Sequence, residues 1–194
     1  LYLKGYAMTK RIILAVSGSI SAYKSADLTS KLKKKGYDIH VIMTEAAQAF
    51  ITPLTLQVLS KNPVHTDVME EKLAERINHI DLAKETDLFI VAPASANTIA
   101  KLAHGMADNM LTATALALPS TTPKLIAPAM NTKMYENPLT KKNLETLQEV
   151  GYQKILPKSG LLACGDTGRG ALADIAVIID SIDSALTRKG VYDE

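Results

Sequence analysis

The chain has 194 residues, 47% of them hydrophobic, and its 22 basic and 20 acidic side chains leave a net charge of +2. A chain of this length can bury a full core, its single cysteine excludes a disulfide framework, and its interspersed charges argue against nucleic-acid binding. No apolar stretch approaches the roughly 18 residues that a membrane span needs, so we expect a cytoplasmic protein without a membrane partner.

Residues 1–7 precede Met8 and are expected to be an upstream extension, which leaves residues 8–194 as one domain. In that domain, short apolar runs alternate with longer helical stretches. Strands are expected at residues 11–17, 38–44, 88–92, 124–127 and 152–156. Helices are expected at residues 21–35, 53–60, 97–103, 109–118, 139–150 and 172–186. Nearly continuous apolar runs suit parallel strands covered on both faces, so the alternation predicts an α/β fold with a single-domain, doubly wound, Rossmann-like or flavodoxin-like parallel sheet.

The first predicted strand ends in Ser17-Gly18-Ser19-Ile20-Ser21 and opens into a helix. Small side chains, hydroxyls and backbone N–H groups at the N-terminus of a helix form a cradle for a phosphate. The segment matches neither the G-x-G-x-x-G fingerprint of dinucleotide sites nor the Gly-Lys-Ser/Thr of a P-loop. Because serine is also a common helix N-cap, this segment by itself leaves both interpretations open.

Two later strands end on the same tripeptide, Ala-Pro-Ala, and polar side chains follow each of them. The first is followed by Ser95, Asn97 and Thr98, and the second by Asn131. Ligands of doubly wound sheets bind outside the carboxyl ends of the strands, so these groups should meet there. Ser95 or Asn97 could be a plain N-cap, but the repetition at two strand ends favours a slot for a planar polar ring. A phosphate cradle beside such a slot suggests a mononucleotide such as FMN.

The only cysteine, Cys164, lies in a segment from Gly160 to Gly170 that holds four of the chain's ten glycines. Glycines remove side-chain cover and permit positive φ, so we interpret the segment as a flap that carries a proton donor or nucleophile, against the alternative of an inert buried thiol. His79 precedes a predicted buried strand and is either a hydrogen-bonded structural residue or a catalytic one. The cysteine and the histidines show no metal-ligand spacing.

Five segments in this order resemble the homo-oligomeric flavin-containing cysteine decarboxylases. They are Ser17-Gly18-Ser19-Ile20-Ser21-Ala22-Tyr23-Lys24, His79, Pro93-Ala94-Ser95-Ala96-Asn97-Thr98, Pro128-Ala129-Met130-Asn131-Thr132-Lys133-Met134-Tyr135 and Ala163-Cys164-Gly165-Asp166-Thr167-Gly168. The resemblance covers residues 10 to about 182. It implies a homotrimer or homododecamer with the flavin at a subunit boundary.

The resemblance also implies roles at the matching positions. His79 would accept a proton, Cys164 would donate one, and Asn131 would hold the substrate carboxylate, with Gly165 and Gly168 also at the substrate. FMN would contact a set of small or polar residues, namely Gly18, Ser19, Ile20, Thr44, Ser95, Ala96, Asn97, Thr98 and Ala129.

The implied reaction converts 4′-phosphopantothenoylcysteine to 4′-phosphopantetheine in coenzyme A biosynthesis. A carboxylate beside a saturated carbon loses carbon dioxide only if the electrons left behind find an acceptor. Oxidation of the thiol-bearing carbon by FMN would create one, a thioaldehyde, and decarboxylation would then give an enethiol that reduced flavin and a proton convert to product. The alternatives are a peptidyl-cysteine decarboxylase or a flavin prenyltransferase on the same fold, and, from another class, an FMN electron carrier.

Overall fold

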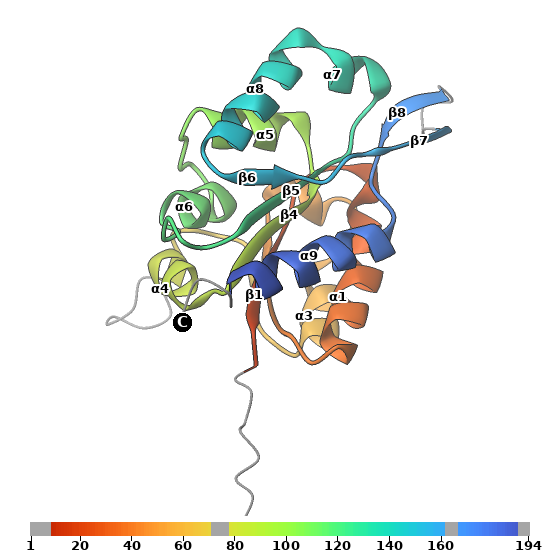
Figure 1. Ribbon diagram of the computed structural model, residues 1–194. Coiled ribbons are helices and arrows are strands. Elements are labelled where there is room, and N and C mark those ends of the chain that lie inside the picture. The colour runs from red at the N-terminus through yellow and green to blue at the C-terminus, as the bar shows by residue number, and fades with distance from the viewer. Residues whose placement is uncertain (1–8, 71–77, 162–166, 190–194) are drawn as a thin grey trace, which may run out of the picture.

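The protein is built around a six-stranded, all-parallel sheet, seen in a computed structural model that describes residues 9–70, 78–161 and 167–189 (Figure 1). The strand order is β3-β2-β1-β4-β5-β6. The bounds are β1 Arg11–Val16, β2 Asp38–Met43, β3 Val64–His65, β4 Leu88–Ala94, β5 Lys124–Pro128 and β6 Tyr152–Lys154. The chain builds outward from β1 on one side and from β4 on the other, which confirms the doubly wound α/β fold.

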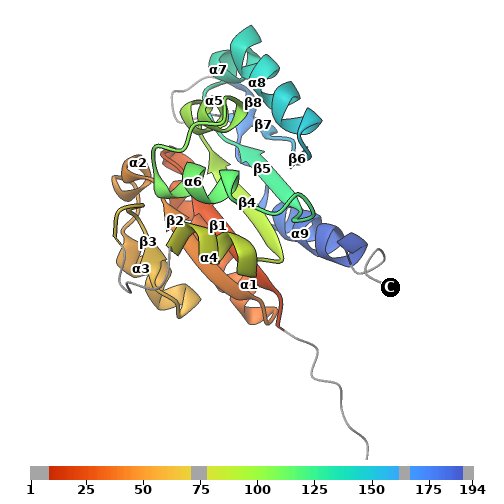
Figure 2. The ribbon, with the colours of Figure 1, turned by 90° about the vertical axis from the view of Figure 1, so that its left-hand side faces the viewer.

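Helices cover both faces of the sheet (Figures 1 and 2). The helices are η1 Ile20–Tyr23, α1 Lys24–Lys34, α2 Glu45–Gln48, α3 Pro53–Ser60, α4 Asn78–Glu85, α5 Ala96–Ala103, α6 Met110–Leu116, α7 Thr132–Glu136, α8 Pro138–Glu149 and α9 Ile175–Lys189. Alternate residues of β1 point to opposite layers: Leu14 packs toward α1, α3 and α9, whereas Ile13 packs toward α4, α6 and α8. None of the described helices is long and apolar enough to cross a membrane.

A separate hairpin follows the sheet. β7 (Lys158–Leu161) and β8 (Thr167–Ala171) pair antiparallel, and β8 lies against α7 (Figure 1). The backbone N–H of Met130, just after β5, donates to the carbonyl of Gly170 in β8 at 2.9 Å. The hairpin is therefore fixed to the segment that follows β5. Cys164 and Gly165 lie outside the described residues.

Some expected bounds differ from those observed. β4 continues to Ala94, so the expected end of this strand at residue 92 is wrong and Pro93 lies within the strand. The carbonyl of Pro93 still accepts a hydrogen bond from the backbone N–H of Ser17 at 3.2 Å, which keeps this end of β4 tied to the end of β1. The helix expected from residue 21 begins as the 3-10 turn η1 before α1, and β3, α2, α4, α7 and the hairpin were not predicted.

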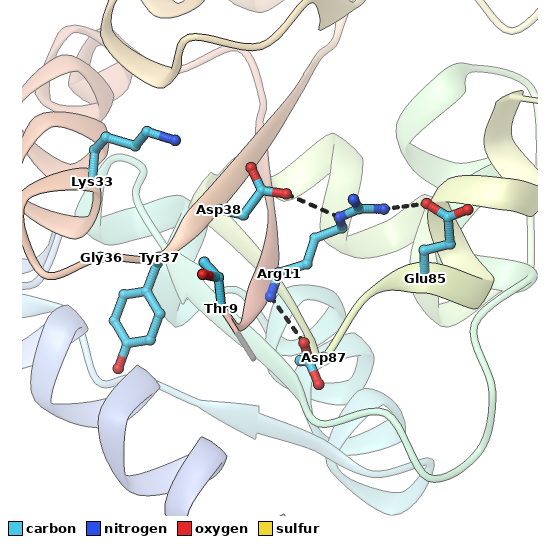
Figure 3. A pocket seen from close by; sticks show the side chains of 8 residues that line it. All are labelled: Thr9, Arg11, Lys33, Gly36, Tyr37, Asp38, Glu85 and Asp87. Carbon is cyan, nitrogen blue, oxygen red and sulfur yellow. Dashed lines mark hydrogen bonds and ion pairs between the residues drawn. The ribbon is translucent and has the colours of Figure 1, made fainter. Parts of the chain in front are cut away.

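A hollow of about 810 Å³ lies where β1, β2 and β4 begin (Figure 3). Arg11 pairs with three of the acidic residues that line it. Arg11 donates from Nε to Asp38 at 3.1 Å and from its guanidinium to Glu85, and its backbone N–H donates to Asp87 at 2.9 Å. This ion-pair network ties three strand beginnings together, whereas the predicted ligand residues follow the opposite, carboxyl ends of the strands.

Candidate active site

Two adjoining cavities lie where β1, β4 and β5 end. They measure about 460 Å³ and about 270 Å³, and both are lined by Gly18, after β1, and by Ser95, after β4. β1 and β4 are neighbours in the sheet, and the chain order reverses between them. Ligands of doubly wound sheets bind at such a switch point, so the position of the cavities agrees with the position predicted for the ligand.

Every residue expected to contact FMN lines one of these cavities. Gly18, Ser19, Ile20, Ser95, Ala96 and Ala129 line the larger one. Thr44, Asn97 and Thr98 line the smaller one together with Gly18 and Ser95. Asn131 lines the larger cavity, as expected of a residue that holds the substrate. The fold thus brings together side chains from four separate segments, and their individual contacts with FMN stay predictions.

Several of these side chains cap helices, which confirms the capping interpretation, and the same residues line the cavities, so capping is compatible with the predicted contacts to FMN. Each accepts a hydrogen bond from a backbone N–H of the helix or turn that it begins. The acceptors and their distances are Ser19 at 3.3 Å, Thr44 at 3.2 Å, Ser95 at 3.2 Å and Asn131 at 2.8 Å. Capping fixes the rotamers of these residues, so the cavity walls are ordered before a ligand binds.

Gly18 allows the turn after β1 to lie directly against α2. A Cβ atom at this position would come within 2.5 Å of the Cβ of Ala46. Thr44, the N-cap of α2, is thereby held beside the turn. The glycine is needed for a close approach of two backbone segments, a reason that the sequence pattern alone does not reveal.

Each cavity has a lysine that the sequence interpretation did not single out. Lys24 lines the larger cavity, and its ammonium lies 5.9 Å from the centre of the Tyr23 ring. Lys101 lines the smaller one and lies 2.5 Å from the carboxylate of Asp108. The hydrogen bond from Lys101 lowers the pKa of Asp108, which keeps that carboxyl ionised and paired. Lys101 follows Asn97 by one helical turn, a spacing that places both on one face of α5.

The predicted proton acceptor lies elsewhere. His79 is in the first turn of α4 and lines neither of the two cavities. Its Nδ1 is buried without a hydrogen-bond partner among the described residues. Gly168 does not line the larger cavity, and a Cβ at Gly168 would approach the side chain of Thr132, the residue after Asn131, to 2.5 Å. No group of three or more metal-ligating side chains occurs in the part of the chain that the structure describes.

Comparisons with known proteins identify the family of the chain. A model of the Flavoprotein family matches residues 4–187. A probable phosphopantothenoylcysteine decarboxylase of Streptococcus mutans is 63% identical over 179 residues, which cover 92% of this chain and 100% of the relative. The coenzyme A biosynthesis bifunctional protein CoaBC of Bacillus subtilis is 50% identical over 165 residues, and this chain spans only 40% of its length.

A solved structure resembles this chain in both fold and sequence. A mutant PPC decarboxylase complexed with pantothenoylaminoethenethiol superposes with a TM-score of 0.83 at 34% identity, covering 90% of this chain and 97% of the other. The likeness therefore extends over nearly the whole of both chains, which supports the doubly wound fold and the family assignment together.

Proposed function

Because this chain belongs to the Flavoprotein family, we propose that its two adjoining cavities hold FMN and the carboxylate substrate. The chain is an FMN-dependent decarboxylase that converts 4′-phosphopantothenoylcysteine to 4′-phosphopantetheine in coenzyme A biosynthesis. The observation that supports the assignment of the cavities is the convergence of all the predicted FMN residues at the switch point of the sheet.

The residues of the two cavities fit FMN. The larger cavity, of about 460 Å³, lies within the range of about 300–1,000 Å³ common to small-molecule sites. Ala96 and Ala129 leave room for a flat ring, and hydroxyls and amides supply donors and acceptors for its polar edge. Lys101 supplies positive charge for the phosphate of FMN, and its pairing with Asp108 keeps that carboxylate from repelling an anion.

Each residue then has a chemical task. When bound, FMN supplies reversible two-electron chemistry, which lets the thiol-bearing carbon of the substrate become an electron sink beside the carboxylate. Asn131, whose Oδ1 accepts from the backbone N–H of Lys133 at 2.8 Å, is oriented at the larger cavity to bind that carboxylate. His79 takes the proton of the substrate thiol, and Cys164 returns a proton to carbon after carbon dioxide has left.

The position of His79 favours an assembly. Since His79 lines neither cavity of its own chain, it would have to act at the cavity of a neighbouring copy. A homotrimer or homododecamer with the active site at each subunit boundary meets this need and places both catalytic residues at one flavin. We assign this assembly to the cytoplasm, with the small-molecule substrate as ligand and with neither a nucleic acid nor a membrane as partner.

Two measurements test the function. Purified protein should be yellow, with the visible absorption of FMN, and should release carbon dioxide from 4′-phosphopantothenoylcysteine. A peptide ending in cysteine should be a poor substrate, which separates this enzyme from a peptidyl-cysteine decarboxylase. A colourless protein that does not bind added FMN would overturn the proposal. Coloured protein inactive on every cysteine substrate would favour an electron carrier.

Replacement of Cys164 by serine should separate the first half of the reaction, release of carbon dioxide, from the second half, conversion of the enethiol to product. Cys164→Ser retains the flavin site and His79, so it should release carbon dioxide once and stop with reduced flavin and enethiol, because serine is a much weaker proton donor than a thiol. A single-turnover assay of carbon dioxide, with the visible spectrum followed in parallel, measures both halves. Multiple turnovers by this variant would remove the proton-donor role.

Lys24 should contribute to binding of the substrate phosphate. Lys24→Met should raise KM for 4′-phosphopantothenoylcysteine by about tenfold, the effect of one lost charge-assisted hydrogen bond, and change KM for the unphosphorylated compound far less. Lys31→Met is the control, because Lys31 lies on the same helix but pairs with Asp27 at 2.7 Å. Equal losses with both substrates would contradict a role in phosphate recognition.

A further inference from the structure

The buried hydroxyl of Ser17 lies next to the two residues, Gly18 and Ser95, that line both cavities. Ser17 is 0% exposed and immediately precedes Gly18, which lines both cavities. Its Oγ donates to the carbonyl of Pro93 at 2.8 Å and accepts from the backbone N–H of Ser95 at 2.8 Å. Ser95 is the other residue that lines both cavities. Ser17 therefore links the two shared walls across the switch point of the sheet.

We propose that Ser17 is a positioning residue of the FMN site, an inference that rests on the proposed function. Its hydroxyl donates and accepts at the same time, which neither alanine nor valine can do. The bond to the N–H of Ser95 fixes where α5 begins relative to β1, because Ser95 is the N-cap of that helix. Its Oγ accepts from the N–H of Thr98 at 3.2 Å. The separation of the β1 turn from the start of α5, and with it the width of the flavin slot, depends on Ser17.

Loss of this hydroxyl has a defined consequence. In Ser17→Ala the carbonyl of Pro93 keeps the bond from the backbone N–H of Ser17 at 3.2 Å, but the N–H of Ser95 loses its partner. An unpaired N–H group shifts until water or another acceptor reaches it, which moves the start of α5 relative to Gly18. Both cavities change shape while the hydrophobic core on either face of the sheet is untouched.

Ser25 offers a matched control. Ser25 is also buried, at 1% exposed, and its Oγ donates to the carbonyl of Ala92, the residue before Pro93, at 3.2 Å. Ser25→Ala removes the same hydroxyl next to the same strand end, but the residue that this hydroxyl bonds, Ala92, lines neither cavity. The two variants should lose similar stability and differ in flavin binding.

The experiment compares both variants with the wild type in the form freed of flavin. FMN is titrated in, quenching of flavin fluorescence gives Kd, and urea unfolding gives stability. Ser17→Ala should raise Kd for FMN by about tenfold and shift the visible spectrum of the bound flavin, whereas Ser25→Ala should change Kd by less than about twofold. Equal Kd values for the two variants, or a Kd that only follows stability, would overturn the inference.

A second pair of variants covers the case in which Ser17→Ala does not fold. Ser17→Thr and Ser17→Val add similar volume and differ only in the hydroxyl, so the threonine variant should bind FMN about tenfold more tightly than the valine variant. Identical affinities in this pair would also overturn the inference. Failure of the wild type to bind FMN would instead refute the proposed function, so the two failures are distinguishable.

Discussion

A His79→Asn protein should bind FMN with wild-type affinity and yet release carbon dioxide at least about 100-fold more slowly, the usual effect of losing a general base. Asparagine keeps the approximate size of the ring and a hydrogen-bonding group but cannot accept a proton. His79 lines neither cavity of its own chain, and at a neighbouring copy its proposed contact is with the substrate thiol, so its loss should leave the residues predicted to bind FMN in place. Fluorescence titration of FMN and a carbon dioxide assay under single-turnover conditions measure the two effects.

His104→Asn is the control for this prediction. His104 ends α5 on the surface, where its Nδ1 lies 2.8 Å from the carbonyl of Ala100, and no role in the reaction is assigned to it. Its replacement should leave both FMN affinity and carbon dioxide release near wild-type values. Normal decarboxylation by His79→Asn would show that this histidine is only structural, the alternative that the sequence left open.

Mixed assemblies test whether His79 acts at a neighbouring copy. His79→Asn and Cys164→Ser proteins are each inactive in full turnover by the reasoning above. When the two are assembled together in equal amounts, about a quarter of the subunit boundaries should combine an intact histidine from one copy with an intact cysteine from the other, by random assortment. Turnover should therefore reappear at about that fraction. If one copy supplied both residues, the mixture would stay inactive.

The sequence predicts the walls of the site well because these walls follow strand ends. Continuous apolar runs mark the parallel strands, and in a doubly wound sheet the first polar residues after such strands must meet at one edge. Ser19, Ser95 and Asn131 were identified in this way, and all three line the larger cavity. The order of the elements and the parallel direction of the strands are enough to bring these residues together.

Features that depend on tertiary contacts were not predictable. α2 and α7 are too short, at 4 and 5 residues, to show a helical period, and β3 has only 2 residues. Lys24 and Lys101 carry no signal of a ligand site until the fold places them against the cavities. The linking role of Ser17 likewise depends on which strand lies beside β1, a fact of topology that the residue pattern near Ser17 does not contain.

Substitution of Gly170 by alanine should displace the β7–β8 hairpin and lower kcat/KM about 100-fold. Gly170 has a φ of +154°, which L side chains rarely adopt, and a Cβ there would lie 2.4 Å from the carbonyl oxygen of Met130. The hairpin could accommodate alanine only by moving away from Met130 and Asn131, at the cost of the 2.9 Å bond between the N–H of Met130 and the carbonyl of Gly170. A shift of about 1 Å in a substrate-binding group commonly lowers activity about 100-fold.

The partner strand of the same hairpin provides the control for this substitution. Gly160 in β7 pairs with Gly168 in β8, but a Cβ at Gly160 would meet no atom within 4 Å. Gly160→Ala should therefore keep nearly wild-type kcat/KM, whereas Gly170→Ala should lose about 100-fold in kcat/KM while unfolding in urea as a single transition. Similar activities for the two variants would mean that contact between β8 and the Asn131 segment does not set the geometry of the substrate site. A loss confined to Gly170→Ala would show that the hairpin positions Asn131 through the close approach that only glycine allows.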